Sequence, residues 1–184
     1  MKTNIGLSIL LITSALTITP AQATDTTEEV CYTPVRGAAL TTCLPEFDAD
    51  GNPLQPCPEM LGQYRIVLKN ASADPVNRYL RLAGPVHGVT NPDQTLNHVL
   101  ADKHAEGLIY TFGDTVIEII PMSECLLQVT EVLNITFGTG KYTGANGTLK
   151  ITGELDQCTG VNELDLVRNE GEVCFKASSL LKDR

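Results

Sequence analysis

A regular alternation of apolar and polar residues from about residue 63 onward constrains this chain of 184 residues more than any other feature. Apolar side chains recur at nearly every second position through segment 127–137, and segments 64–69 and 149–155 repeat the pattern. Successive side chains of a β-strand point to opposite faces of a sheet, so a strand with one buried face has this period. Short runs of glycine, asparagine and aspartate separate the alternating segments. The pattern predicts an all-β, antiparallel domain over residues 63–184, either a sandwich or a barrel.

Residues 90–103 are compatible with two secondary structures. Asn91 could cap a helix whose first turn contains Pro92, and the apolar residues that follow have helical spacing. On a strand, one face would instead present Leu96, His98 and Leu100. The strands expected on both sides favour a strand here, and the helix remains the alternative.

Five glycines fall in the stretch 137–156, FGTGKYTGANGTLKITGELD, which could suggest a phosphate-binding loop. Its spacing fits neither the G-x-x-x-x-G-K-[ST] nor the G-x-G-x-x-G template, and both templates require a following helix, whereas a period-two segment follows here. The stretch therefore predicts a strand, a glycine corner, a tight turn at Asn146–Gly147, and a second strand.

The same motif, G-T-G-K-Y-T-G-A-N-G followed by an alternating strand, resembles that of the allene-oxide-cyclase-barrel-like group, which includes allene oxide cyclases, dirigent proteins and bacterial secreted proteins. The resemblance covers about 20 residues, 137–156, and a weaker likeness to bacterial members continues to Phe175. It implies an antiparallel barrel of eight strands around an apolar cavity, which in plant members holds oxidised fatty acids or phenolic radicals. The catalytic residues of those proteins lie outside the shared motif, so none is transferred to this chain.

The first 23 residues have the organisation of a secretory signal peptide. Lys2 precedes the apolar stretch 5–18, and Ala21-Gln22-Ala23 has the small residues of a cleavage site. We therefore expect an exported protein, periplasmic or secreted, with no membrane span after cleavage. Residues 24–62 contain five prolines and no clear periodicity, and they are predicted to form a loop-rich segment before the barrel.

Six cysteines follow the signal peptide, and an even number in an exported chain predicts up to three disulfides. They are Cys31, Cys43, Cys57, Cys125, Cys158 and Cys174. Their grouping suggests that the first three pin the N-terminal segment and that Cys158 and Cys174 could close the last hairpin, although the pairing stays open. The C-x-x-C pairs of zinc sites do not occur.

The chain is acidic, with 13 basic and 22 acidic residues. Because Lys2 lies in the signal peptide, the mature chain would carry a charge of about −10. An acidic surface repels the phosphates of nucleic acid and of anionic lipid, and no basic patch with interleaved aromatic residues occurs. Nucleic acid is therefore not an expected partner.

Glu131 is the candidate catalytic residue because it occupies an apolar position of its strand, between Val129 and Leu133. A carboxylate facing a barrel interior would have a raised pKa and could transfer protons or bind a polar group of a ligand. A bulge that reverses the strand faces, or a position at the wet mouth of the barrel, would remove this role. Tyr64 and Tyr110, with Glu131, are the predicted ligand-binding residues.

Two weaker metal patterns are present. Three histidines, His87, His98 and His104, could join Asp102 around a metal ion, but they lack the tight local spacing of zinc ligands. Residues 48–52 with Glu59 resemble part of a calcium loop, which prolines interrupt. We therefore predict no metal and no cofactor.

Three functions fit these features. The leading one is binding of a small, mostly apolar molecule inside the barrel. The alternatives are a cyclase or isomerase that uses Glu131 on a reactive apolar ligand, and a secreted structural or interaction protein whose barrel is filled by its own side chains. The ligand and the oligomeric state are not determined by the residues.

Overall fold

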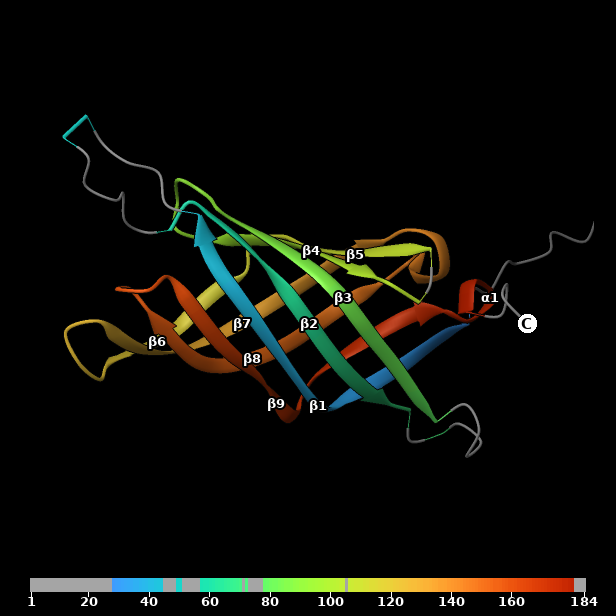
Figure 1. Cartoon of the computed structure of the whole chain (residues 1–184). Helices are drawn as coiled ribbons and strands as arrows, with labels where there is room; N and C mark the ends of the chain where they lie inside the picture. Colours follow the sequence, from blue (N-terminus) through green and yellow to red (C-terminus); the bar gives the residue numbers. More distant parts are fainter. Residues whose placement is uncertain are drawn as a thin grey trace, which may run out of the picture.

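An antiparallel β-barrel makes up nearly all of the computed structural model, which describes residues 28–44, 49–50, 57–70, 72, 78–104 and 106–180 (Figure 1). The predicted signal peptide, residues 1–23, lies outside the described residues. The elements are β1 (Glu29–Leu44), β2 (Glu59–Lys69), β3 (Tyr79–Thr90), β4 (Leu96–Asp102), β5 (Gly107–Thr111), β6 (Thr115–Pro121), β7 (Leu126–Gly138), the 3-10 helix η1 (Gly140–Tyr142), β8 (Asn146–Asp156), β9 (Val161–Lys176) and α1 (Ala177–Leu180).

Eight strands close the barrel in the order β5-β4-β3-β2-β1-β9-β8-β7, and pairing of β5 with β7 completes the ring. Every pairing is antiparallel, so the predicted eight-stranded antiparallel barrel is confirmed. β6 lies outside the ring, paired with β7 along residues 127–132. In Figure 1 this strand and the adjoining ends of β7, β8 and β9 project from one end of the barrel.

β5 and β6 are two parts of one kinked path along the same edge of β7. β5 pairs with residues 135–138 of β7, and β6 pairs with residues 127–132. Between them Gly113 has φ +65°, a conformation that glycine adopts without steric cost. The kink carries β6 away from β4, and an isolated bridge joins Leu96 of β4 to Asp114, the residue before β6. One end of the barrel is therefore left open.

Large side chains fill the interior. Those most completely buried include Leu68, Leu82, Ile109, Tyr142, Leu149 and Phe175. The cavity that remains between β1, β2, β4 and β7 measures only about 50 Å³ and is bordered mainly by aliphatic side chains. The apolar cavity that the resemblance implies is thus reduced to a volume of one or two water molecules.

The prediction that residues 24–62 form an irregular segment is wrong for β1. This 16-residue strand lies between β2 and β9 in the barrel. Its period was hidden because its pairing with β2 shifts register between Pro34 and Arg36. A proline is tolerated at such a bulge because no ladder hydrogen bond requires its missing N–H.

Three disulfides link the chain: Cys31–Cys174, Cys43–Cys57 and Cys125–Cys158. The first two pin the N-terminal region as predicted, whereas the expected closure of the last hairpin by Cys158 and Cys174 is wrong. Cys31 and Cys174 lie directly opposite each other on β1 and β9. Cys125 and Cys158 join the β6–β7 turn to the β8–β9 turn. The pairing follows from strand neighbours that are far apart in sequence.

Two local predictions have clear outcomes. Residues 96–102 form strand β4, with Leu96, His98 and Leu100 all buried, so the strand alternative for residues 90–103 is confirmed. The glycine stretch 137–156 forms a strand, a corner and a strand, but the tight turn is misplaced. Asn146–Gly147 begins β8, and η1 makes the turn instead.

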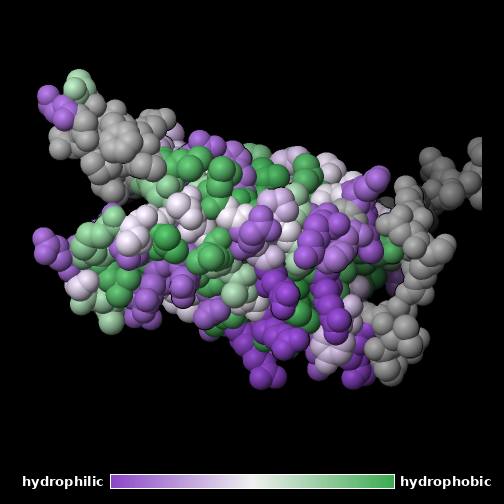
Figure 2. Space-filling view, in the orientation of Figure 1, coloured by the Kyte–Doolittle hydropathy of each residue, from purple (hydrophilic) through white to green (hydrophobic). Residues whose placement is uncertain are grey.

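Exposed apolar side chains gather on β6 and the turn after it, at Ile117, Ile119, Ile120 and Met122. Figure 2 shows hydrophobic surface at the projecting end of the strands, while hydrophilic side chains gather along the lower part of this face. Among the described residues, no helix is both long and apolar enough to span a membrane.

Candidate functional site

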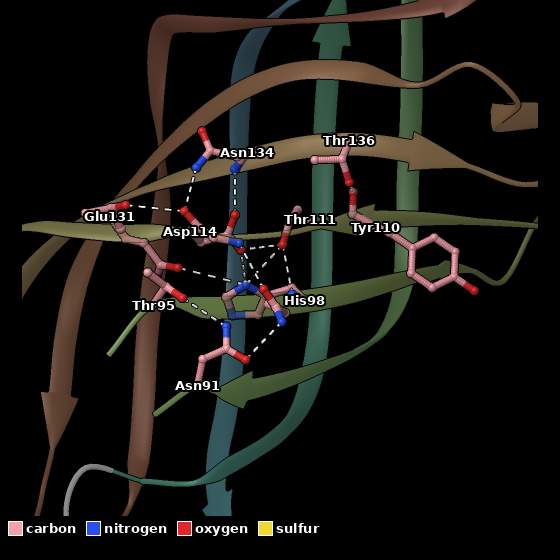
Figure 3. A network of polar contacts seen from close by, with 12 residues as sticks. Asn91, Thr95, His98, Tyr110, Thr111, Asp114, Glu131, Asn134 and Thr136 are labelled. Carbon is pink, nitrogen blue, oxygen red and sulfur yellow. Dashed lines mark hydrogen bonds and ion pairs between the residues drawn. The ribbon is translucent and has the colours of Figure 1, made fainter. Parts of the chain in front are cut away.

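A buried cluster of one imidazole and two carboxylates lies at the open end of the barrel (Figure 3). His98 comes from β4, Asp114 from the kink between β5 and β6, and Glu131 from β7. Their relative exposures are 8%, 0% and 5%. One ligand atom from each lies within 4.8 Å of the others. Burial of three ionisable groups costs free energy unless they pair with one another or bind an ion.

Asp114 holds the kink together. Its Oδ1 accepts a hydrogen bond of 2.6 Å from the backbone N–H of Asn134, where the ladder along the β5 and β6 edge of β7 is interrupted. The side-chain amide of Asn134 donates in turn to the carbonyl of Gly113, at 2.7 Å. A buried backbone N–H needs a partner, and the Asp114 carboxylate takes the place of a strand here. Asp114 therefore has a structural role in addition to its place in the cluster.

His98 is fixed at both its backbone and its ring. Its backbone N–H donates to Thr111 Oγ1 at 2.8 Å, and its Nδ1 donates to Asp114 Oδ2 at 2.7 Å. The hydroxyl of Thr111 also donates to Asp114 Oδ2. Gly88 lies opposite His98 on β3, and a Cβ there would come within 2.8 Å of the ring. The imidazole therefore occupies space that only glycine leaves free.

Glu131 points into the barrel, between Val129 and Leu133, as the alternation indicated. The bulge on this pairing lies in β6, between Val116 and Glu118, so β7 keeps its faces. Oε1 of Glu131 is fully buried and has no hydrogen-bond partner within the part of the chain that the structure describes. It lies 3.9 Å from Nδ1 of His98.

Burial raises the pKa of Glu131 to about 7, an effect that the charge of His98 opposes and that of Asp114 reinforces. Burial alone would lower the pKa of His98. The hydrogen bond from Asp114 and the charges of Glu131 and Asp114 outweigh it, so the pKa of His98 is raised. Both groups therefore hold protons more strongly than they would in water.

A pocket of about 650 Å³ opens above this cluster, at the end from which β6 projects. Its aliphatic lining comprises Met60, Leu96, Val116, Ile119, Leu127, Val129 and Leu155, and the Cys43–Cys57 disulfide, Thr90, Asp93 and Asn162 contribute to its border. His98 and Glu131 follow Leu96 and Val129 on the same strand faces, about 7 Å deeper. The cluster thus lies two residues further along these strands than the side chains at the floor of the pocket.

The other two predicted ligand-binding residues differ in their relation to the cluster. Tyr64 faces the interior and borders the small cavity, which His98 also borders, and burial followed by the charge of Asp102 raises its pKa. Asp102 accepts a hydrogen bond from the hydroxyl of Tyr142 deeper in the barrel. The prediction that Tyr110 binds a ligand inside the barrel is wrong. Tyr110 alternates with the buried Ile109, and its ring stacks on Phe137, an exposed residue. Its ring points away from the cluster in Figure 3, so it cannot contact a ligand in the barrel.

The three histidines considered and rejected as metal ligands are not brought together. His87 pairs with Glu59, both partly exposed, at 2.7 Å, and His104 is exposed. The calcium-like stretch 48–52 falls mostly outside the described residues. Asp114 is not identified from the sequence as a candidate site residue. Its signal was the Gly113–Asp114 pair between two alternating segments, where a kink leaves backbone groups to be satisfied.

The fold and the site together define a closed eight-stranded antiparallel barrel with a buried His–Asp–Glu cluster beneath a pocket at its open end. Comparisons of the chain with protein-family models, curated proteins and solved structures found no match.

Proposed function

We propose that this chain is an exported barrel protein that binds a small, mostly apolar molecule in the pocket at the open end of the barrel. The observation that carries the proposal is the pocket itself, with about 650 Å³ of space and a mainly aliphatic lining. Small-molecule sites usually occupy about 300–1,000 Å³ and combine apolar walls with a few placed polar groups. The polar side chains that line it are Thr90, Asp93, Gln94, Thr95, Thr115, Asp156, Gln157 and Asn162. The His98, Asp114 and Glu131 cluster lies beneath them, outside the lining.

The position of the ligand differs from the one expected from sequence. The interior of the barrel has room for about 50 Å³, which excludes a metabolite-sized molecule. The kink at Gly113 separates β6 from β4, and the space opened there lies outside the packed interior. The proposed ligand would therefore bind at the mouth of the barrel. Three disulfides agree with an exported protein, because such bonds persist in oxidising compartments.

Membership of the allene-oxide-cyclase-barrel-like group is part of the same proposal. The closed barrel of eight antiparallel strands supports it, as does the glycine corner between β7 and β8. That corner lies at the end of β7 far from Leu127 and the pocket. The shared motif therefore bears on the architecture and carries no information about the ligand.

Native mass spectrometry of the purified, disulfide-bonded protein tests the proposal, together with titration of an environment-sensitive apolar fluorophore. Leu127→Trp should reduce fluorophore binding at least tenfold, because Leu127 lines the pocket. Gln128→Trp is the matched control, because Gln128 is exposed on the opposite face of the same strand. Equal binding by both variants would contradict the proposed pocket. No bound molecule and no fluorophore binding would favour a structural or interaction protein.

A cyclase or isomerase remains the second candidate, and one observation favours it. The Glu131 carboxylate is buried, faces inward and lies beside His98, one step below the pocket. Such a group can transfer a proton within a water-poor site. NMR spectra of a co-purified ligand, incubated with wild type and with Glu131→Gln, would follow its conversion. Unchanged conversion by the variant would contradict a catalytic role for Glu131.

A further inference from the structure

We propose that His98, Asp114 and Glu131 form a binding site for a divalent first-row transition metal ion, with Zn²⁺ the best-matched ion. The three side chains come from separate segments of the fold, and they converge with one ligand atom each within 4.8 Å of the others. This site is distinct from the apolar pocket above it and does not depend on the proposed ligand.

The distances fit a shared ion. Zinc bonds to imidazole nitrogen and carboxylate oxygen are about 2.0–2.2 Å, so tetrahedral ligand atoms lie about 3.3–3.5 Å apart. His98 Nδ1 lies 2.7 Å from Asp114 Oδ2 and 3.9 Å from Glu131 Oε1. These two separations bracket the required value and the third is within 4.8 Å, so side-chain shifts of about 0.5–1.3 Å would admit the ion. Nδ1 would then bind the ion instead of donating to Asp114, and the neutral imidazole would carry its proton on Nε2.

The unpartnered carboxylate oxygen points to a ligand. The burial of Asp114 is explained by the kink that it stabilises, and the burial of His98 is explained by its hydrogen bond to Asp114. Glu131 Oε1 accepts no hydrogen bond among the described residues, and its ion-pair contact with His98 Nδ1 is long, at 3.9 Å, although the side chain is only 7% exposed. Buried carboxylates are ordinarily paired, hydrogen-bonded or bound to metal. A divalent cation between two carboxylates and a neutral imidazole would also bring the net charge of the cluster to zero.

The donor set selects among ions. One imidazole nitrogen and two carboxylate oxygens suit Zn²⁺ and its first-row neighbours. Calcium takes six to eight oxygen ligands, and magnesium usually keeps several waters, so neither matches a buried site containing an imidazole. All six cysteines are in disulfides, which leaves no thiolate for a softer ion.

The supporting contacts hold two of the ligands in place before the ion binds. The Asn134 backbone N–H and the Thr111 hydroxyl orient the Asp114 carboxylate. Hydrogen bonds of this kind, made to the side chains that bind a metal ion, commonly tune the affinity for the ion. Three protein ligands leave at least one coordination position, which water or a polar group of a bound molecule could take. Only that last role rests on the proposed function.

Isothermal titration with ZnCl₂ of the purified, disulfide-bonded protein, first dialysed against a chelator, tests the site. We expect one equivalent of Zn²⁺ per chain, and at least about 100-fold weaker binding by Glu131→Gln. This variant is suited to the test because the Glu131 carboxylate accepts no hydrogen bond in the described structure, so its loss should leave the fold intact. Glu154→Gln, the same change at an exposed position of β8, should bind Zn²⁺ like wild type.

Co²⁺ provides a spectroscopic check on the location. The visible absorption of the Co²⁺ protein should show coordination by nitrogen and oxygen, and it should be lost in Glu131→Gln. If wild type binds no Zn²⁺, the proposal is wrong. It is also wrong if Glu131→Gln retains the ion and His87→Asn loses it, because the ion would then lie at the exposed His87–Glu59 pair.

Failure of the metal site is distinguishable from failure of the ligand pocket. Leu127→Trp should impair fluorophore binding and leave Zn²⁺ affinity unchanged, because Leu127 lines the pocket and takes no part in the cluster. Loss of Zn²⁺ binding in Leu127→Trp, with the fold preserved, would contradict the placement of the ion on these three residues.

Discussion

At the residue scale, the two acidic side chains of the cluster, Asp114 and Glu131, differ in their hydrogen-bond partners. Asp114 has a complete set of partners and closes the gap that the kink leaves in the β7 ladder. Glu131 is also buried, yet its Oε1 accepts no hydrogen bond in the described chain and contacts His98 only at 3.9 Å. Removal of Asp114 would therefore damage the fold, whereas changes at Glu131 report on function and on protonation.

Stability of the metal-free protein should fall as pH rises through neutrality. Burial raises the pKa of Glu131 from 4.5 to about 7, and the pKa of His98 is also raised. A group whose pKa is raised by folding stabilises the native state below its unfolded pKa, and this contribution disappears as pH passes the folded value. Glu131 alone should contribute at most about 3 kcal/mol, lost between about pH 4.5 and 7.

Urea unfolding from pH 5 to 8, with chelator present, measures this effect. Glu131→Gln should give a flatter profile, because glutamine does not titrate, and it should be the more stable protein at pH 8. Parallel profiles for the variant and wild type would mean that Glu131 ionises in the native state at its ordinary pKa.

Gly88→Ala should displace the imidazole of His98. A Cβ at this position would lie 2.8 Å from Cδ2 and 3.0 Å from Nε2 of the ring, which is held on its other side by Asp114. Overpacking of this kind costs about 1–3 kcal/mol. Urea unfolding measures the loss, and imidazole NMR resonances report the movement. Unshifted His98 resonances would show that the ring does not depend on the glycine.

At the element scale, the start of β8 depends on a glycine that sequence reasoning assigned to a turn. Gly147 has φ +126°, and a Cβ there would collide with the backbone carbonyl of Glu172 on β9. Gly147→Ala should therefore cost about 3 kcal/mol or more, because it combines backbone strain with a clash that no side-chain rotation relieves.

Gly113→Ala is the matched control for this prediction. Gly113 also has positive φ, +65°, but a Cβ there would meet nothing within 4 Å. Its cost should be limited to the left-handed conformation, about 1–2 kcal/mol. Urea unfolding of both variants gives the difference. Equal losses would mean that the β8–β9 contact relaxes around the added methyl group.

At the scale of the whole molecule, the Cys31–Cys174 disulfide joins the first and last strands of the barrel. It links positions 143 residues apart, whereas Cys43–Cys57 links positions 14 apart. Constraint of the unfolded chain grows with loop length, so removal should cost about 5 kcal/mol for the first disulfide and about 3 kcal/mol for the second.

The double variants Cys31→Ser/Cys174→Ser and Cys43→Ser/Cys57→Ser, compared by guanidinium unfolding, measure these costs. The first pair should unfold at clearly lower denaturant concentration. The reverse order would show that strain or residual structure in the unfolded chain outweighs loop length.

Much of the barrel could be predicted from local sequence, and the exceptions share a cause. Alternation identified β2, β7 and β8, and the apolar positions 96, 98 and 100 identified one face of β4. β1 was not predicted as a strand because Pro34 and a register shift interrupt its alternation of apolar and polar residues. The turn-type residues Asn169–Gly171 lie inside β9, where its pairing with β8 shifts register. Bulges leave strands continuous in space while breaking the period by which they are recognised.

The sequence by itself determined that this chain forms antiparallel strands, and it indicated an inward position for Glu131, because side chains alternate between the two faces of a strand unless a bulge intervenes. Only the tertiary structure decided which cysteines pair, that Tyr110 faces outward, and that the interior is filled while a pocket opens beside β6. It also decided that Glu131 meets His98 and Asp114. These outcomes depend on strand order and register between segments distant along the chain, and local periodicity contains no information about either.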